Sequence, residues 1–317
     1  MSVIYSRWVG IDVSRDWLDL HVLPSGTSYR IPYTQAEYES WLQTQCDGSD
    51  EVLFILESTG GLEKPLHEAI ERHGHGVARV NPRQVKDFSR ALNRAKTDRL
   101  DAQTLAEYGK RIEPAATPLL CEAQQALKDL VMRRRQLVEM KSAEQNRLSR
   151  APQRVRQDIE AHVKELQGRI QVLDEEIADL QSQNAEFCHK AKLLTSVPGV
   201  GTVTAGVCLA LLPELGSLDS KRIARLVGLA PLNHDSGQKS GKRMISGGRS
   251  QVRCALYMAA LVGIQHNEVL RAFYQRLLDQ GKVKRVALVA VMRKLLTILN
   301  ALIRTDKPWQ QPEPEAV

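Results

Sequence analysis

The segment WVGIDVSRDWLDL, residues 8–20, joins two short apolar runs and places an acidic residue, Asp12, inside the first of them. The apolar residues around Asp12 are typical of a buried strand. An ionised carboxylate is costly to bury unless a partner or a metal ion compensates its charge. Asp12 is therefore either a metal-binding or catalytic residue, or a strand-end residue that caps the following turn through Ser14. This stretch alone leaves both interpretations open.

The composition indicates a chain of two or three domains that is attracted to polyanions. The 317 residues carry a formal net charge of +7 at pH 7, and the sequence pI is about 9.2. Five scattered cysteines without a CxxC pair argue against a disulfide framework or a thiolate zinc site. No signal peptide opens the sequence, and its longest apolar stretches are too short or are interrupted by Arg293 and Lys294. We therefore expect a cytoplasmic protein without a membrane span.

Residues 1–115 alternate between strand and helix patterns, which predicts an α/β domain with a mixed sheet flanked by helices. Apolar runs predict strands at 8–13, 17–23, 52–57 and 77–80. Helical periodicity predicts helices at 35–44, 62–72, 82–90 and 98–111. The first two strands are close enough in sequence to form a hairpin.

Three further acids in this domain are candidates to share a site with Asp12. Glu57 ends the apolar run EVLFILE, and Asp98 and Asp101 lie three residues apart in KTDRLDA, on one face of a predicted helix. Together the four acids would supply the oxygen ligands that Mg²⁺ prefers, and Mg²⁺ can activate a phosphodiester. Singly, each acid is also explained by a structural role: helix capping at Glu57 and Asp98, and solvation at Asp101.

Residues 116–190 form the second predicted domain, a helical linker with a coiled coil. Glycine and proline are rare there, so we expect two long helices with a break near residue 151. In the second helix, apolar residues recur at alternating steps of four and three, as in the seam of a coiled coil. The seam residues are Ile159, Val163, Leu166, Ile170, Leu173, Ile177 and Leu180. Their partner is either the preceding helix or another protomer.

The third predicted domain, residues 191–306, is mainly helical, and residues 307–317 are expected to form a disordered tail. The segment 193–212 is typical of a helix-hairpin-helix, in which a turn with Gly199 and Gly201 presents backbone N–H groups to a phosphate. An ordinary turn between buried helices explains the same two glycines.

A glycine-rich basic loop lies within residues 233–260. The stretch from Ser236 to Asn267 has no acidic residue. Its lysines and arginines are Lys239, Lys242, Arg243, Arg249 and Arg253. Glycine allows a backbone to approach a phosphate, and the cationic side chains favour a nucleic-acid backbone. The alternative is a flexible, solvated loop.

The motifs GIDVS, LESTG and AKTDRLDA, followed by SGKR and GGR in the basic loop, resemble the DEDD transposases of insertion sequences, a family that includes the Piv-type DNA invertases. The resemblance covers nearly the full chain and implies an RNase H-like (RuvC-like) first domain. It implies that Asp12, Glu57, Asp98 and Asp101 bind Mg²⁺. It also implies that Ser236 is a nucleophile that forms a phosphoserine–DNA intermediate.

The same resemblance implies the partners of the protein. They are donor and target DNA, a structured guide RNA, and further copies of the chain in a homodimer or homotetramer. The basic segment 128–158 has nine lysines and arginines against four acids, which suits a structured RNA. By their chemistry, Arg243, Arg249 and Arg253 are candidates to stabilise the charge of a phosphorane.

Two other classes of enzyme share parts of this pattern. The four acids also fit a metal-dependent nuclease of the RuvC or RNase H type, such as a Holliday-junction resolvase, for which Ser236 would be incidental. A sugar kinase or actin-like ATPase would open with a similar GIDVS loop. However, the APLNH segment before DSGQ is no strand, and its basic flank suits DNA better. We therefore favour a transposase, with the nuclease as the alternative.

Overall fold

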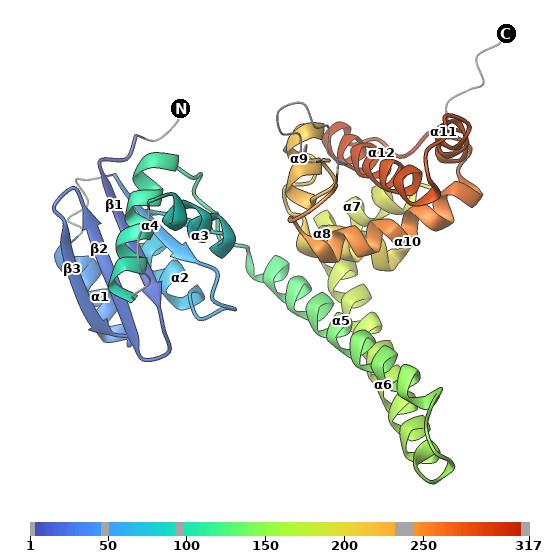
Figure 1. Cartoon of the computed structure of the whole chain (residues 1–317), viewed down its shortest axis with the longest axis horizontal. Helices are drawn as coiled ribbons and strands as arrows, with labels where there is room; N and C mark the ends of the chain where they lie inside the picture. Colours follow the sequence, from blue (N-terminus) through green and yellow to red (C-terminus); the bar gives the residue numbers. More distant parts are fainter. Residues whose placement is uncertain (1–3, 46–50, 93–97, 232–243, 312–317) are drawn as a thin grey trace. The chain divides into compact units, whose positions relative to one another are not determined.

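The computed structural model describes residues 4–45, 51–92, 98–231 and 244–311, with side chains included except at 98–100. The chain divides into two compact units, Met1–Leu119 and Leu120–Val317 (Figure 1). Each unit has a hydrophobic core of its own.

The first unit is built on a five-stranded mixed sheet with the strand order β3-β2-β1-β4-β5. The central strand β1 pairs antiparallel with β2 and parallel with β4. The outer pairs are β2–β3, which is antiparallel, and β4–β5, which is parallel. The strands are β1 Arg7–Val13, β2 Trp17–Leu23, β3 Thr27–Pro32, β4 Val52–Glu57 and β5 Gly76–Val80. The mixed sheet predicted for the first domain is confirmed.

Strand β3 was not among the strands that the sequence predicts. It lies at the edge of the sheet, and each of its residues is exposed or only half-buried. An edge strand of this kind lacks the apolar run by which buried strands are recognised. The antiparallel hairpin of β1 and β2 therefore extends to a three-stranded meander.

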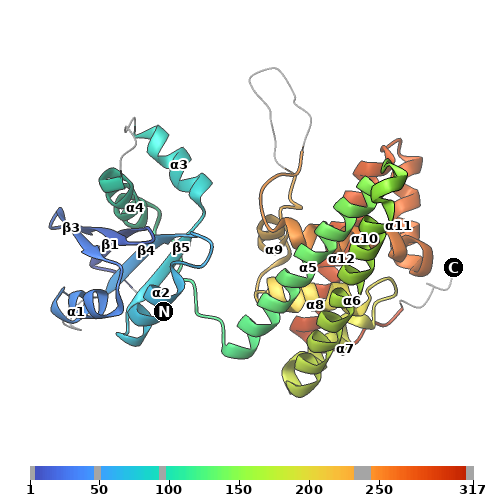
Figure 2. The same ribbon diagram turned by 90° about the horizontal axis from the view of Figure 1, so that it is seen from below.

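Helices cover both faces of this sheet, as Figure 2 shows, with α1 and α2 on one face and α3 and α4 on the other. One core contains Val9, Ile11, Trp41 and Leu66, while the opposite core contains Ile55, Val85 and Leu105. The helices are α1 Gln35–Gln45, α2 Lys64–Arg72, α3 Pro82–Ala91 and α4 Asp98–Ile112. All four predicted helices are present.

Helix α4 packs against β1 at very short range. A Cβ atom added at Gly10 would lie 2.1 Å from the carbonyl oxygen of Ala102, and one added at Gly109 would lie 3.3 Å from Trp8 Cδ1. Because the start of β1 lies beside the end of α4, the helix runs antiparallel to the strand. Only glycine at position 10 leaves room for the helix backbone.

The second unit begins with an antiparallel pair of long helices, α5 Glu122–Leu148 and α6 Gln153–Gln183. Leu137 packs with Leu166 and Ile170, and Arg134 forms an ion pair with Asp174. All seven predicted seam residues of α6 are buried or half-buried. Within the described chain, α5 is therefore the partner of the middle of this seam.

The remaining helices enclose the core of the second unit, and the start of α5 and the end of α6 pack into it (Figure 1). Leu127 of α5 and Leu180 of α6 both contact this core. The helices are α7 Ala185–Thr195, α8 Thr202–Leu211, α9 Ser220–Val227, α10 Ser250–His266, α11 Glu268–Asp279 and α12 Lys284–Thr305. The mainly helical character predicted for this part of the chain is confirmed.

Helix α12 is the one described helix that is long and apolar enough to cross a membrane. By length and composition, therefore, Arg293 and Lys294 do not exclude a membrane span in α12, although the sequence analysis took them to interrupt one. Half of its most apolar window is nevertheless buried inside the unit. Since Val291, Leu295 and Leu299 belong to the core, α12 has the role of a core helix.

Part of the expected disordered tail contacts the second unit instead. Trp309 packs against the core, and its backbone N–H donates a hydrogen bond to Ser196 Oγ at 2.8 Å. These two contacts join the tail to the second unit at Trp309.

We expect Gly10→Ala to destabilise the first unit by about 1–3 kcal/mol, because the new methyl group would force α4 away from β1. Gly168→Ala is the matched control, since its added Cβ has nothing within 4 Å. This control should be neutral or stabilising by up to about 1 kcal/mol, as glycine is a poor helix residue. Urea unfolding followed by tryptophan fluorescence measures the first unit, which holds three of the four tryptophans. Far-UV circular dichroism in the same titration measures the helices of the second unit, in which Gly168 lies. Equal stabilities would contradict the packing described.

Candidate active site

Asp12 and Glu57 lie at the carboxyl ends of two adjacent parallel strands. Ile11 of β1 is the register partner of Leu56 of β4. The next residue along each strand is the acid, so the two carboxylates leave the sheet on the same face and at the same edge. Both side chains are half-buried. The structure thus brings together the two strand acids that the sequence singled out.

The first turn of α4 lies at the level of the same edge. Gly10 contacts the helix at Ala102, and β1 continues from Gly10 toward Asp12 while α4 runs back toward its start. Asp98 begins α4, and Asp101 is half-buried one turn later. We call the carboxyl ends of β1 and β4 and the first turn of α4 the acidic edge.

The acidic edge has the ligand chemistry of a Mg²⁺ site, since all of its candidate donors are carboxylates. Among the described side chains, however, no group of three or more His, Cys, Asp or Glu residues is arranged to hold a metal ion. The side chain of Asp98 is outside that set. The site of four acids therefore stays a prediction.

A fifth acid, Asp19, lies directly opposite Asp12 on β2. Like charges in this position are destabilising. Arg30 of β3, the register partner of Asp19, donates two hydrogen bonds to its carboxylate, at 2.9 and 2.7 Å. The ion pair compensates the charge next to Asp12. Sequence reasoning missed it because β3 itself was not predicted.

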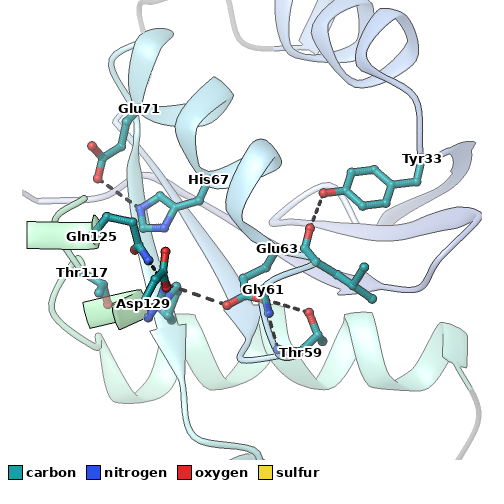
Figure 3. A network of polar contacts seen from close by, with 11 residues as sticks. Tyr33, Thr59, Gly61, Glu63, His67, Glu71, Thr117, Gln125 and Asp129 are labelled. Carbon is teal, nitrogen blue, oxygen red and sulfur yellow. Dashed lines mark hydrogen bonds and ion pairs between the residues drawn. The ribbon is translucent and has the colours of Figure 1, made fainter. Parts of the chain in front are cut away.

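The loop that follows Glu57 is held by a second acid that the sequence did not single out, Glu63. Its side chain is 4 % exposed, and Oε2 accepts hydrogen bonds from Thr59 N–H at 3.2 Å, Thr59 Oγ1 at 3.0 Å and Gly61 N–H at 2.9 Å (Figure 3). Its other oxygen lies 3.8 Å from Arg79 Nη1. Burial raises the pKa of the Glu63 carboxyl, but hydrogen bonds from its own N–H, Thr59 and Gly61 outweigh burial and leave the pKa below its ordinary value.

The Tyr33 hydroxyl ties this loop to the end of β3 by donating a hydrogen bond to the Leu62 carbonyl (Figure 3). Gly60 and Gly61 adopt φ values of +77° and +113°, which other residues rarely reach. The loop after β4 is therefore held at Thr59, Gly61 and Leu62. Glu57, the last residue of β4, is fixed by the strand itself.

In the second unit, four predicted site residues lie outside the described part of the chain, namely Ser236, Lys239, Lys242 and Arg243. The glycines that flank this stretch meet closely. A Cβ atom at Gly248 would lie 2.4 Å from the backbone nitrogen of Gly228, and one at Gly228 would lie 2.3 Å from the Gly247 carbonyl oxygen. The chain segments before and after the basic stretch are thus packed together at α9.

Arg249 and Arg253 bind protein groups in this structure. Arg249 forms a bidentate ion pair with Glu214, with both distances 2.5 Å. Arg253 donates hydrogen bonds to the carbonyls of Val227, at 2.8 Å, and of Gly247. Both side chains thus hold the segment after the basic loop against neighbouring parts of the second unit. Their predicted contact with nucleic acid stays a prediction, and sequence alone could not reveal these partners.

Gly199 and Gly201 occupy the turn between α7 and α8, as predicted. A Cβ atom at Gly199, which has a φ of +101°, would lie 2.5 Å from Gly263 Cα, so close packing against α10 requires glycine here. Gly201 is the N-cap of α8, with open space around it and no side-chain cap. The ordinary structural interpretation explains Gly199, whereas Gly201 leaves the helix start accessible.

Comparison with known proteins gives two family matches along the chain. The model of the DEDD transposases of IS110 matches residues 9–155. A second model, described as transposases of the IS116/IS110/IS902 family, matches residues 191–275. The two matches cover the sheet with part of the long helices, and the helical core.

Individual relatives agree with these matches. The pilin gene-inverting protein of Moraxella bovis is 30% identical over 315 residues, which are 96% of this chain and 98% of the relative. The corresponding protein of Moraxella lacunata has the same identity and coverage. A 42 kDa protein of the insertion element IS900 of Mycobacterium paratuberculosis is 33% identical over 151 residues, 45% of this chain and 37% of the relative.

We expect Glu63→Gln to lower the stability of the first unit at pH 7 by about 1–3 kcal/mol, because the charge that orders the loop after β4 is lost. A carboxyl with a depressed pKa stabilises the fold above its unfolded pKa of about 4.3, and this contribution is lost as the pH falls through the lower folded pKa. The wild type should therefore lose stability below about pH 4.5, and the variant should lose less.

Glu68→Gln serves as the control for this prediction, since Glu68 is an exposed acid of α2, the helix that begins directly after Glu63. It should change stability by less than about 0.5 kcal/mol. Urea unfolding between pH 3 and 7 measures all three proteins. Parallel pH profiles for Glu63→Gln and wild type would count against the role assigned to Glu63.

Proposed function

This chain belongs to the transposase family of the IS110, IS116 and IS902 elements, and we propose that it breaks and rejoins DNA with a metal site at the acidic edge and a serine nucleophile. The family makes it an enzyme of DNA transposition or recombination. The observation that carries the metal site is the register of β1 and β4, in which Ile11 is paired with Leu56, so that Asp12 and Glu57 are the next residues of the two strands. The antiparallel course of α4, which starts with Asp98, supports the inclusion of Asp101.

In this proposal Asp12, Glu57, Asp98 and Asp101 hold a divalent metal ion, as is usual for DEDD transposases. Mg²⁺ is our choice because carboxylates are its preferred protein ligands. When bound, it polarises a phosphodiester and neutralises charge that develops on its oxygens. The fixed loop after β4 and the Asp19–Arg30 pair keep the ligands in place and add no competing charge.

Ser236 is the nucleophile that we propose for strand exchange. Its Oγ forms a bond to phosphorus, the bond from phosphorus to the leaving DNA strand breaks, and the serine proton ends on a base or on the leaving oxygen. A phosphoserine conserves the energy of the phosphodiester, so a new strand end can reverse the reaction and reseal the DNA. Hydrolysis would lose that energy. The basic residues Lys239, Lys242 and Arg243 would bind the DNA backbone beside it.

The partners of the protein follow from the same chemistry. Donor and target DNA must be cut in one complex, which favours a homodimer or homotetramer. A structured guide RNA is part of the proposal because of the basic segment 128–158. Gly201 leaves the start of α8 accessible, so the backbone N–H groups there are suited to bind a phosphate. We place the reaction in the cytoplasm, in keeping with the scattered cysteines.

The alternative function is a metal-dependent nuclease that acts without a covalent intermediate. It uses the same acidic edge and no serine. The two functions differ in the fate of the DNA end, which is protein-bound in the first and free in the second.

We expect Asp12→Asn and Asp101→Asn each to lower DNA cleavage by more than about 100-fold, because even residues outside a ligand shell contribute 10- to 100-fold. Asp16→Asn, an exposed acid in the turn after β1, is the matched control and should cleave normally. The assay is cleavage of labelled element-end DNA with Mg²⁺, with EDTA, and after Mg²⁺ is restored. Full activity in EDTA, or in both variants, would exclude the proposed metal site.

Ser236→Ala should abolish the covalent protein–DNA adduct, because no hydroxyl remains to accept the phosphoryl group. Ser240→Ala is the matched control in the same loop and should form the adduct at the wild-type level. Denaturing gels of labelled DNA distinguish the adduct from free ends. Normal adduct from Ser236→Ala would reject this nucleophile, and free ends without adduct from wild type would establish the nuclease.

A further inference from the structure

A strip of the sheet beside Asp12 has no role in substrate binding in the function proposed above. In β2, Leu18 and Leu20 point into the core with α1 and α2, so Trp17 and Asp19 lie on the opposite face, which also carries Asp12. In the register, Asp12 is opposite Asp19, and Asp19 is opposite Arg30. Trp17 and Arg30 therefore share a face and an edge with the proposed metal site.

Trp17 is a large aromatic residue that remains on the surface, with 46% of it exposed. Its ring has no aromatic or cation–π contact among the described residues. Its backbone, by contrast, is fixed, because the Ser14 hydroxyl accepts from Trp17 N–H at 3.1 Å and Ser14 N–H donates to the Trp17 carbonyl at 3.0 Å. An anchored, exposed indole is well suited to stack against a flat ligand.

Arg30 has a similar combination of anchorage and exposure. Its Nε and one terminal nitrogen bind the Asp19 carboxylate, which is 13% exposed, while the Arg30 side chain is 56% exposed. The ion pair fixes the plane of the guanidinium group at the surface. A planar guanidinium in a fixed position is a good donor to phosphate oxygens.

The spacing of these residues matches a nucleic-acid strand that leads to Asp12. Neighbouring β-strands lie about 4.8 Å apart, and successive residues of one β-strand advance by about 3.3 Å along it. The Cα of Trp17 is therefore about 8 Å from that of Asp12, and the Cα of Arg30 is about 10 Å away. At the stacked rise of duplex DNA, about 3.4 Å, two or three nucleotides cover these distances, and a more extended unpaired strand needs fewer.

We propose that Trp17 and Arg30 form a platform for an unpaired stretch of the substrate DNA strand next to the acidic edge. The indole of Trp17 stacks on a base, and the guanidinium of Arg30 contacts a backbone phosphate. That this DNA strand is the substrate of the reaction rests on the function proposed above. A protein partner is less favoured, because a single aromatic ring between an ion pair and acids is no continuous apolar patch.

The test uses the full-length protein in EDTA, so that binding is measured without cleavage. The probe is a single-stranded DNA oligonucleotide with 2-aminopurine, whose fluorescence falls when it stacks, and the comparison is the matching duplex. Wild type should quench the single strand more than the duplex. Trp17→Ala should remove this quenching and weaken single-strand binding about 10-fold, since base–aromatic stacking is worth about 1–3 kcal/mol. Trp17→Phe should retain most of both.

Two exposed residues of the same unit provide controls. Ile112→Ala removes an apolar side chain that is 52% exposed, at the far end of α4, and Arg90→Ala removes a guanidinium that is 70% exposed. Neither should change quenching or affinity. Arg30→Ala should reduce the slope of log K against log salt concentration by about 0.7, the value for one phosphate contact on a single strand, while Arg90→Ala should not.

If Trp17→Ala quenches the probe as strongly as wild type, the proposal is overturned, whatever the change in affinity. It is also overturned if Trp17→Ala loses as much affinity for the duplex as for the single strand. An unchanged salt slope in Arg30→Ala would overturn the phosphate contact. If Trp17→Ala fails to fold, Trp17→Phe decides: retained quenching supports the platform and lost quenching overturns it. A wild type that quenches the probe but never cleaves DNA with Mg²⁺ would refute the proposed function and leave the platform intact.

Discussion

The close approach of α4 to β1 is the constraint on which the geometry of the first unit depends. The helix backbone lies so near the strand that a single methyl group at Gly10 would fall 2.1 Å from the Ala102 carbonyl oxygen. Because the two elements run antiparallel, this contact also sets how far the helix start extends along the strand. The first turn of α4 reaches the level of Asp12 for this reason, although it is separated from it by more than 80 residues of sequence.

Charge at the edge of the sheet is the second constraint, because acids follow one another across it: Asp12 is paired with Asp19, and Glu57 follows the partner of Ile11. Two acids outside the proposed ligand set have well-defined protein partners: Arg30 pairs with Asp19, and N–H and hydroxyl groups of the loop after β4 surround Glu63. In our account a divalent cation adds to the compensation of the acids in the ligand set, and Asp19 and Glu63 serve the fold.

The sequence predicted what depends on local pattern and missed what depends on tertiary contact. Apolar runs located β1, β2, β4 and β5, and the motifs located the acids that end β1 and β4. The exposed edge strand β3 lacks such a run, so the Asp19–Arg30 pair could not be foreseen. Arg249 was identified by charge alone. Its bidentate partner Glu214 lies 35 positions away, and only the fold brings the two together.

The central claim is that acids from two strands and a helix bind one metal site. Anomalous diffraction from crystals grown with Mn²⁺, which shares the preference of Mg²⁺ for oxygen ligands, tests it most directly. Our account predicts a peak at the acidic edge with carboxylate oxygens of Asp12, Glu57 and at least one of Asp98 and Asp101 at coordination distance. A peak elsewhere with the acidic edge empty, or these carboxylates on separate surfaces, would contradict it.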